Sequence, residues 1–378
     1  MPQAVIAGYA RSPFHLAGKG ALARTRPDDL AASVVNALVA RTGVDPQAIE
    51  DLIVGCAFPE GEQGFNVARL IGLIAGLPQS VGGMTVNRFC GSSMSSVHYA
   101  AGQIALGAGE VFIAAGVESM SRVPMMGFNP LPNPELAKSS AAYIGMGDTA
   151  ENLASRYAIS RAAQEEFALE SQAKAAAAIA GGRLADEIVP IATKAGLVDS
   201  DGCPRPGTTA EGLAGLKPAF SATGTVTAGT SSPLTDGASA VLVTSEDYAR
   251  AHGLPILARI RSTAISGCGP EIMGIGPVES SRKALARVGI TVADLDVIEL
   301  NEAFASQSLA CIADLGLDRA KINLDGGAIA LGHPLGATGA RIVGKAAALL
   351  QRTGGRFALA TQCIGGGQGI ATVLEAVR

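Results

Sequence analysis

The sequence predicts a layered α/β fold in which helices cover mixed β-sheets and one structural unit occurs twice along the chain. In both copies a helix ends at a glycine, Gly43 or Gly289, and an apolar strand follows a short acidic turn. The two copies are 246 residues apart, counted from Gly43 to Gly289, and a second helix–turn–strand pair at 100–116 and 346–362 keeps the same offset. Two pairs with one offset indicate a duplicated βα unit.

The residues between the two copies differ in composition and are predicted to be an insertion. A loop rich in proline and methionine opens this segment, and helices follow it. Asp148 and Glu151 have the spacing of a capping box, and a second helix is expected to start after Ser160 and to stop at Gly181–Gly182. The predicted organisation is an N-terminal half at 1–118, an insertion at 119–248 and a C-terminal half at 249–378.

Composition narrows the class of protein. Of 378 residues, 48% are hydrophobic and 16% charged, which excludes a largely disordered chain and indicates two or three domains. A formal charge of -4 argues against nucleic acid or an anionic membrane as a partner. We find neither a membrane-spanning apolar run nor the pattern of a secretory signal. The six cysteines form no C-x-x-C pair, so we expect reduced thiols, no metal site and a location in the cytoplasm.

Two glycine-rich turns carry residues suited to nucleophilic catalysis. Cys90 precedes a helix of small residues, and the free N–H groups and positive dipole at such a helix N-terminus lower the pKa of a thiol. The alternative is a buried structural cysteine. His333 lies between Gly332 and Pro334, where a rigid loop suits a general base. A phosphate-binding loop is disfavoured because the Lys-Ser/Thr of that motif is missing.

Two further motifs place polar groups beside predicted strands. Cys363 enters a triple-glycine turn, Gly365–Gly367, whose backbone N–H groups suit an oxyanion site. Taken alone, that pattern is better explained by a plain hairpin turn with a core cysteine. Asn301 and Glu302 interrupt an apolar passage from strand to helix, so they must be hydrogen-bonded or functional. Helix capping is the alternative for Asn301.

Together the four motifs resemble the signatures of the thiolase family. The matching strings are NRFCGSSM around Cys90, NEAFA at 301–305, GHPLGATGAR at 332–341 and CIGGGQG at 363–369, in family order and over both halves. The resemblance implies a duplicated five-layer αβαβα sandwich with mixed five-stranded sheets, in which the insertion is the family's loop domain. It also implies an acyltransferase, an acetyl-CoA C-acyltransferase, with coenzyme A as a substrate and no cofactor.

The resemblance implies a role for each residue of these motifs. Cys90 is expected to become acylated, His333 to activate it, and Cys363 to exchange a proton with the α-carbon of acetyl-CoA. Asn301 is expected to hold a water that forms one oxyanion hole with His333, and the backbone N–H groups of Cys90 and Gly365 form the other. Cleavage of a 3-ketoacyl thioester needs these parts, because it requires a thiol nucleophile and hydrogen-bond donors for the expelled enolate.

Four residues are expected near the substrate. The resemblance implies that Ser232 contacts the pantetheine, Met273 packs near the acyl thioester and Arg205 lies near the nucleotide of coenzyme A. Ordinary turn and core roles are the alternatives. In biosynthetic members of the family a histidine precedes the Met-Gly of the loop domain, whereas here Gly145 precedes Met146 in the segment YIGMGD. Without that histidine there is more room at the acyl end, which favours a degradative thiolase.

We therefore expect a 3-ketoacyl-CoA thiolase of fatty-acid β-oxidation that works through an acyl-Cys90 intermediate. An acetyl-CoA acetyltransferase acting on acetoacetyl-CoA is the alternative. A non-catalytic lipid carrier is disfavoured by the intact Cys90, His333 and Cys363, and a decarboxylating ketosynthase usually has a histidine in place of Cys363. The expected partners are acyl-CoA, CoA and further copies of the chain in a homodimer or homotetramer, and a hydratase/dehydrogenase chain is left open.

Overall fold

Ten strands form the main sheet of the structure, a computed structural model that describes residues 2–377. Their bounds are β1 Ala4–Arg11, β2 His15–Leu16, β3 Asp51–Gly55, β4 Gly82–Val86, β5 Val111–Ser119, β8 Thr235–Ser245, β9 Ala258–Gly267, β10 Val297–Leu300, β11 Phe357–Ile364 and β12 Gln368–Glu375. Nine of them run in the order β10-β11-β12-β9-β1-β8-β5-β3-β4, and β2 pairs with β8. Parallel and antiparallel pairs are combined, so the sheet is mixed, as the sequence predicts.

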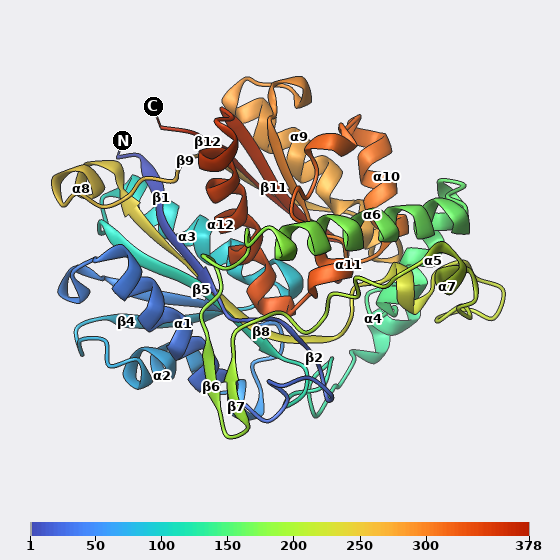
Figure 1. Cartoon of the computed structure of the whole chain (residues 1–378), viewed down its shortest axis with the longest axis horizontal. Coiled ribbons are helices and arrows are strands. Elements are labelled where there is room, and N and C mark those ends of the chain that lie inside the picture. The colour runs from blue at the N-terminus through green and yellow to red at the C-terminus, as the bar shows by residue number, and fades with distance from the viewer. Residues whose placement is uncertain (1, 378) are drawn as a thin grey trace.

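Twelve α-helices lie in the same described residues. They are α1 Pro27–Thr42, α2 Val67–Ile74, α3 Ser92–Leu106, α4 Pro134–Ser139, α5 Met146–Arg156, α6 Arg161–Ala180, α7 Ala210–Ala214, α8 Glu246–Ala251, α9 Gly276–Val288, α10 Ala305–Leu315, α11 Ala328–Leu331 and α12 Leu335–Thr353. The short 3₁₀ helices are η1 Pro46–Ala48, η2 Gly61–Gln63, η3 Phe89–Gly91, η4 Ala228–Thr230, η5 Pro270–Ile275, η6 Val292–Asp294 and η7 Arg319–Lys321. Figure 1 shows the blue N-terminal half beside the orange and red C-terminal half, with α3 and α12 between them.

Side-chain alternation along the strands produces the layers. Because successive strand residues point to opposite faces, Leu52 and Val54 of β3 pack with α1 and α2, whereas Ile53 packs with α3 and α12. In the other half, Ala360 of β11 faces the same two central helices, and Leu359 faces α9 and α10. Helices therefore form the outer layers and the middle layer, and the predicted αβαβα arrangement is confirmed.

The two halves differ in strand number. The N-terminal half supplies β4, β3, β5, β8 and β1, and the C-terminal half supplies β9, β12, β11 and β10, joined to the first half by the pairing of β1 with β9. The fifth position of the C-terminal half is reduced to a single parallel bridge between Ile298 and Ile322. The chain turns away directly after that bridge, because Asn323 has a left-handed φ of 47°.

The expected insertion, 119–248, contains one strand of the main sheet. Strand β8 pairs along its length with β1 and β5, so it belongs to the N-terminal half. The rest of the segment carries α4 to α7 and the hairpin of β6 (Ile191–Thr193) and β7 (Gly196–Val198), and α6 crosses the C-terminal half in Figure 1. We therefore propose that the insertion ends at residue 234. The sequence repeat resumes only near 249, and strand pairing is a long-range property that the repeat does not reveal.

Of the two predicted helix caps, the one at Ser160 is confirmed and the one at Asp148 is wrong. Ser160 accepts a hydrogen bond from the N–H of Ala163, so it caps α6 as expected. The capping box of Asp148 and Glu151 is wrong, because α5 begins two residues before Asp148 and its N-cap is Gly145. The Glu151 carboxylate instead accepts the backbone N–H groups of Thr225 and Val226. Glu151 thereby ties α5 to the loop before η4.

Glycines let the middle helices approach each other closely. A Cβ atom on Gly339 of α12 would lie 2.2 Å from the backbone nitrogen of Met94 in α3. A Cβ atom on Gly116 of β5 would lie 2.1 Å from the carbonyl oxygen of Gly336 at the start of α12. Neither position has room for a side chain, because real Cβ atoms do not approach backbone atoms so closely. The start of α12 is thereby pressed against the N-terminal half.

We expect Gly339→Ala to lower the free energy of unfolding by about 1–3 kcal/mol, because the added methyl group forces the two central helices apart. Thermal and urea unfolding measure this change. The matched control is Gly102→Ala in α3, where nothing lies within 4 Å of the added Cβ. That variant should stabilise the helix by about 0.5–1 kcal/mol. Equal stability of the two variants would contradict the close packing of α3 and α12.

Candidate active site

Three turns from both halves of the chain meet at one cavity. Cys90 lies in η3 directly before α3, His333 lies between α11 and α12, and Cys363 is near the end of β11. All three line a cavity of about 190 Å³. The turn of Cys90 approaches β11 closely, since a Cβ atom on Gly91 would lie 2.4 Å from the Cδ1 atom of Ile364. The predicted convergence of these distant motifs is therefore present in the structure.

The cavity also brings together three of the four expected substrate contacts. Met146, Ser232 and Met273 line it. Apolar residues without a predicted role complete much of the wall: Met120, Met125, Phe220, Leu234, Phe304 and Leu335. Arg205 is exposed and lies outside this lining, and its backbone N–H donates to Gln172 Oε1 at 2.8 Å. Its contact with a nucleotide stays a prediction.

Burial has a larger effect on the pKa of the Cys90 thiol than the neighbouring helix N-terminus. Removal from water raises the pKa of the Cys90 thiol to about 11, although the backbone N–H groups of Gly365 and of Cys90 itself lower it. The expectation of a stabilised thiolate is therefore wrong for the resting protein. The sequence shows the local helix terminus, whereas burial depends on the whole fold. Cys90 is a neutral thiol that needs a base when it reacts.

The hydrogen bonds of His333 define its tautomer. The hydroxyl of Thr338 donates to the carbonyl oxygen of Pro334 at 2.9 Å, and its oxygen lies 2.6 Å from Nδ1 of His333. Because that hydroxyl has one proton, we assign the proton of the imidazole to Nδ1, which donates to Thr338. The Nε2 atom then carries the lone pair that can act as a base, and this lone pair accepts a hydrogen bond from the Asn301 amide at 3.3 Å. Burial lowers the pKa of His333 to about 3, so the ring is neutral at rest.

Asn301 lies beside this base rather than at a helix cap. Its Nδ2 group is 3.3 Å from Nε2 of His333, and α10 takes Phe304 as its N-cap, so the capping alternative is wrong. Asn301 is fully buried, and among the described residues its Oδ1 atom has no hydrogen-bond partner. A buried amide oxygen of this kind needs a donor. A water in contact with a bound substrate would satisfy it.

Cys363 lines the cavity, and the glycine turn follows it in the chain. Residues Ile364 and Gln368 pair across the turn between β11 and β12, so the predicted hairpin is confirmed. Gly366 and Gly367 have φ values of 79° and 82°, which explains the glycines there. Burial and the neighbouring Cys90 raise the pKa of the Cys363 thiol well above its usual value. Cys363 is therefore a proton-carrying thiol in the resting protein.

Three residues without a predicted role support the catalytic groups. Thr338 orients the imidazole, Thr235 Oγ1 accepts the backbone N–H of His333 at 3.1 Å, and the side-chain amide of Gln362 donates to the carbonyl oxygen of Cys90. Thr338 was detectable from the sequence, because it stands in the first helical turn five residues after His333. The other two contacts join segments far apart in the chain, and the sequence carries no local signal for them.

Comparison with known proteins agrees with this geometry. The family model for the thiolase N-terminal domain matches residues 4–247, and that for the thiolase C-terminal domain matches residues 254–376. The chain belongs to the thiolase family. It is 48% identical to the 3-ketoacyl-CoA thiolase of Bacillus subtilis, over 99% of this chain and 100% of that protein. It is 52% identical to the 3-ketoacyl-CoA thiolase of Shewanella denitrificans, over the full length of both.

A solved structure of another thiolase has the same fold. The crystal structure of human mitochondrial 3-ketoacyl-CoA thiolase in complex with CoA superimposes with a TM-score of 0.92 and 38% sequence identity, covering 100% of this chain and 98% of that chain. The four motifs that resemble thiolase signatures are therefore part of a full-length family match.

We expect the alkylation of Cys90 by iodoacetamide to accelerate steadily between about pH 7 and pH 10. With a pKa of about 11, the thiolate fraction grows about tenfold per pH unit over this range. Mass spectrometry of the peptide that contains Cys90 measures the rate, and Cys90→Ala identifies that peptide. A rate that is already constant near neutral pH would instead indicate a preformed thiolate–imidazolium pair and would contradict the neutral resting state.

Proposed function

We propose that this thiolase is a 3-ketoacyl-CoA thiolase of the degradative type. It cleaves 3-ketoacyl-CoA with free CoA to acetyl-CoA and an acyl-CoA shortened by two carbons. The observation that carries the proposal is one cavity lined by Cys90, His333 and Cys363, with the amide of Asn301 at the imidazole. The full-length relatives named 3-ketoacyl-CoA thiolase support the same activity.

The first half-reaction breaks the carbon–carbon bond. His333 Nε2 takes the proton of Cys90 as the sulfur bonds to the 3-keto carbon, and the resulting oxyanion accepts the backbone N–H groups of Cys90 and Gly365. The C2–C3 bond then breaks, and its electrons form the enolate of acetyl-CoA. The protonated imidazole and a water held by Asn301 stabilise the enolate oxygen. Cys363 donates its proton to C2, which releases acetyl-CoA and leaves a thiolate.

The second half-reaction returns every proton. The thiolate of Cys363 takes the proton of the incoming CoA thiol, whose sulfur attacks the acyl-Cys90 thioester. Cys90 leaves and regains its proton from the imidazolium of His333. The neutral resting states of both thiols and the imidazole are thereby restored, in agreement with the raised pKa of each thiol and the lowered pKa of the histidine.

The cavity wall favours acyl chains longer than acetoacetyl. Gly145 stands where biosynthetic thiolases are expected to carry a histidine, directly before Met146. Met146 lines the cavity, and Met120, Met125, Phe220 and Leu234 are apolar neighbours in the same lining. Methionine side chains are flexible and adapt to ligands of different shape. An acetyl-CoA acetyltransferase restricted to four carbons is the second candidate, and a chain-length series separates the two.

We propose a homodimer that pairs through the edge of the main sheet. Strand β4 ends the sheet order, and an unpaired edge is a template for a second strand. The neighbouring α2 exposes three apolar side chains, Leu70, Leu73 and Ile74. Burial of these side chains by a second copy would remove an apolar surface from water. Light scattering of the wild type and of Leu73→Glu tests the dimer, which the added charge should weaken.

Location and larger assemblies stay predictions from the sequence. No helix within residues 2–377 combines the length and apolarity needed to cross a membrane. The predicted features are a cytoplasmic location, a homotetramer and a hydratase/dehydrogenase partner chain.

We expect the purified protein to release acetyl-CoA from medium-chain 3-ketoacyl-CoA and free CoA. Cys363→Ala should still form acyl-Cys90 from an acyl-CoA, yet lose carbon–carbon cleavage by about 10²–10⁴-fold because the proton donor is gone. Cys90→Ser should lose the exchangeable acyl-enzyme. Intact-protein mass and acetyl-CoA release measure the two steps.

Absence of turnover with substrates from four to sixteen carbons would contradict the proposed function. Turnover of the four-carbon substrate alone would favour the acetyltransferase. The matched control is Cys311→Ala, since this buried cysteine of α10 does not line the cavity and should leave both steps unchanged.

A further inference from the structure

A buried carboxylate lies next to the active site and has no part in the reaction described above. Glu302, directly after Asn301, is only 2% exposed, and no lysine or arginine of the described residues forms an ion pair with it. Burial raises its pKa. A buried carboxylate without a cation is costly unless hydrogen bonds satisfy both oxygens, so its partners reveal what it holds.

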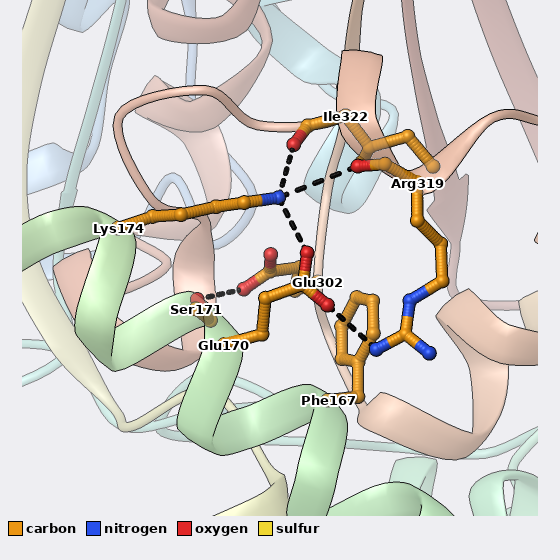
Figure 2. Close-up of a pocket in the computed structure, with 7 residues that line it drawn as sticks. All are labelled: Phe167, Glu170, Ser171, Lys174, Glu302, Arg319 and Ile322. Atoms are coloured by element: carbon orange, nitrogen blue, oxygen red, sulfur yellow. Dashed lines mark hydrogen bonds and ion pairs between the residues drawn. The ribbon is translucent and has the colours of Figure 1, made fainter.

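Both oxygens of Glu302 are satisfied by segments distant in the sequence. One oxygen accepts the hydroxyl of Ser171 at 2.6 Å and the backbone N–H of Ile329 at 3.1 Å. The other accepts the side-chain amide of Asn323 at 2.7 Å. Figure 2 shows the bond from Ser171 on α6 to this carboxylate. Glu302 therefore connects the insertion, the segment after η7 and the helix α11 at a single point.

The contact with α11 leads directly to the base. Ile329 lies in the first turn of α11, and this four-residue helix ends at Leu331, two residues before His333. The carboxylate thus holds the helix that precedes His333. Glu302 is also the residue directly after Asn301 in the chain. One side chain therefore fixes both partners of the 3.3 Å contact between Asn301 Nδ2 and His333 Nε2.

The loop around the carboxylate of Glu302 packs closely against it. Asn323 accepts the N–H of Leu300 at 3.0 Å and donates to its carbonyl oxygen at 2.8 Å, so its side chain extends the pairing beyond β10. A Cβ atom on Gly327 would lie 2.0 Å from Cδ of Glu302. The backbone N–H of Gly327 donates to Ser171 at 3.2 Å. The loop thus leaves no freedom for the carboxylate to move.

A second set of contacts holds α6 in place on the outer side of this cluster. Lys174 donates to the carbonyl oxygens of Ile322 and Arg319 at 2.9 and 3.4 Å, and Glu170 pairs with both Lys174 and Arg319 (Figure 2). A cavity of about 10 Å³, close to the volume that one water needs, separates these ion pairs from Glu302. The outer pairs can anchor α6 without Glu302, so anchoring alone does not explain the buried charge.

We propose that Glu302 is a positioning residue that holds the amide of Asn301 and the imidazole of His333 at the spacing needed to stabilise the enolate. The proposal rests on the roles proposed above for these two residues. An uncharged isostere cannot replace the carboxylate, because the NH₂ group of a glutamine would face the N–H of either Asn323 or Ile329. Misplacement of catalytic groups by a fraction of an ångström to one ångström is sufficient to slow a reaction strongly.

A double-mutant cycle tests this proposal. We expect Glu302→Gln to lower kcat for thiolysis about 10- to 100-fold, with the KM for CoA changed less than about twofold. In the Asn301→Ala background the same change should cost clearly less than in the wild type, because one of the two groups that Glu302 positions is already absent. Equal losses in both backgrounds, or a loss confined to KM, would overturn the positioning role and indicate a general structural role.

A milder variant covers the case in which Glu302→Gln does not fold. Ser171→Ala keeps the carboxylate and removes one of its donors, and it should lower kcat about three- to tenfold in the wild type and by a smaller factor in Asn301→Ala. The matched control is Ser308→Ala on α10, because this buried hydroxyl has no hydrogen-bond partner among the described residues. It should leave kcat unchanged.

The cycle also separates this inference from the proposed function. If Asn301→Ala alone leaves kcat unchanged, the proposed oxyanion role of Asn301 fails and the positioning role fails with it. If Asn301→Ala is impaired while neither Glu302→Gln nor Ser171→Ala lowers kcat, the proposed function stands and only the positioning role is overturned.

Discussion

The close approach of α12 to the N-terminal half is the constraint on which the active site depends. His333 enters this helix from the C-terminal half, whereas Cys90 belongs to the N-terminal half. Gly336 allows the contact, since a Cβ atom there would lie 2.5 Å from the carbonyl oxygen of Val117. The buried carboxylate of Glu118 accepts the N–H groups of Gly336 and Ala57, each at 2.8 Å. The first turn of α12 thus obtains its missing acceptor from the opposite half of the molecule.

The same burial determines the protonation states. The side chains of Cys90, His333 and Cys363 are buried where the two halves meet, and this burial raises the pKa of both thiols and lowers that of the imidazole. Charge is therefore disfavoured at rest and develops only when a substrate supplies an oxyanion that the backbone N–H groups and the imidazole can stabilise. Neutral groups at short range suit a reaction in which protons move between sulfur, nitrogen and carbon.

Local features of the site could be predicted from the sequence, and long-range ones could not. Cys90, His333 and Cys363 each lie in a contiguous glycine-rich motif whose chemistry is visible in a few residues. The predicted thiolate was wrong because the helix terminus is local and burial is not. The capping box at Glu151 was wrong for a similar reason, since Thr225 and Val226 supply competing donors from 74 and 75 residues away.

Pairing in the sheet shows the same limit. The duplicated βα unit predicts two similar halves, yet it does not reveal that β8 leaves the insertion to join β1 and β5, or that the fifth strand of the C-terminal half shrinks to one bridge at Ile322. Likewise, the sequence indicates that Glu302 needs partners, but Ser171, Asn323 and Ile329 meet it only in the folded chain. Polar residues in apolar passages are thus detectable, whereas their partners are not.

The central claim is that two thiols and one imidazole from distant turns face one small volume. A short bifunctional alkylating reagent, 1,3-dibromoacetone, tests it directly when the modified protein is digested and its peptides are weighed. The structure predicts that Cys90 becomes linked to Cys363 or to His333, and that Cys90→Ala prevents the link. The convergence would be contradicted if the reagent modified Cys90 but its second reactive end bound neither Cys363 nor His333.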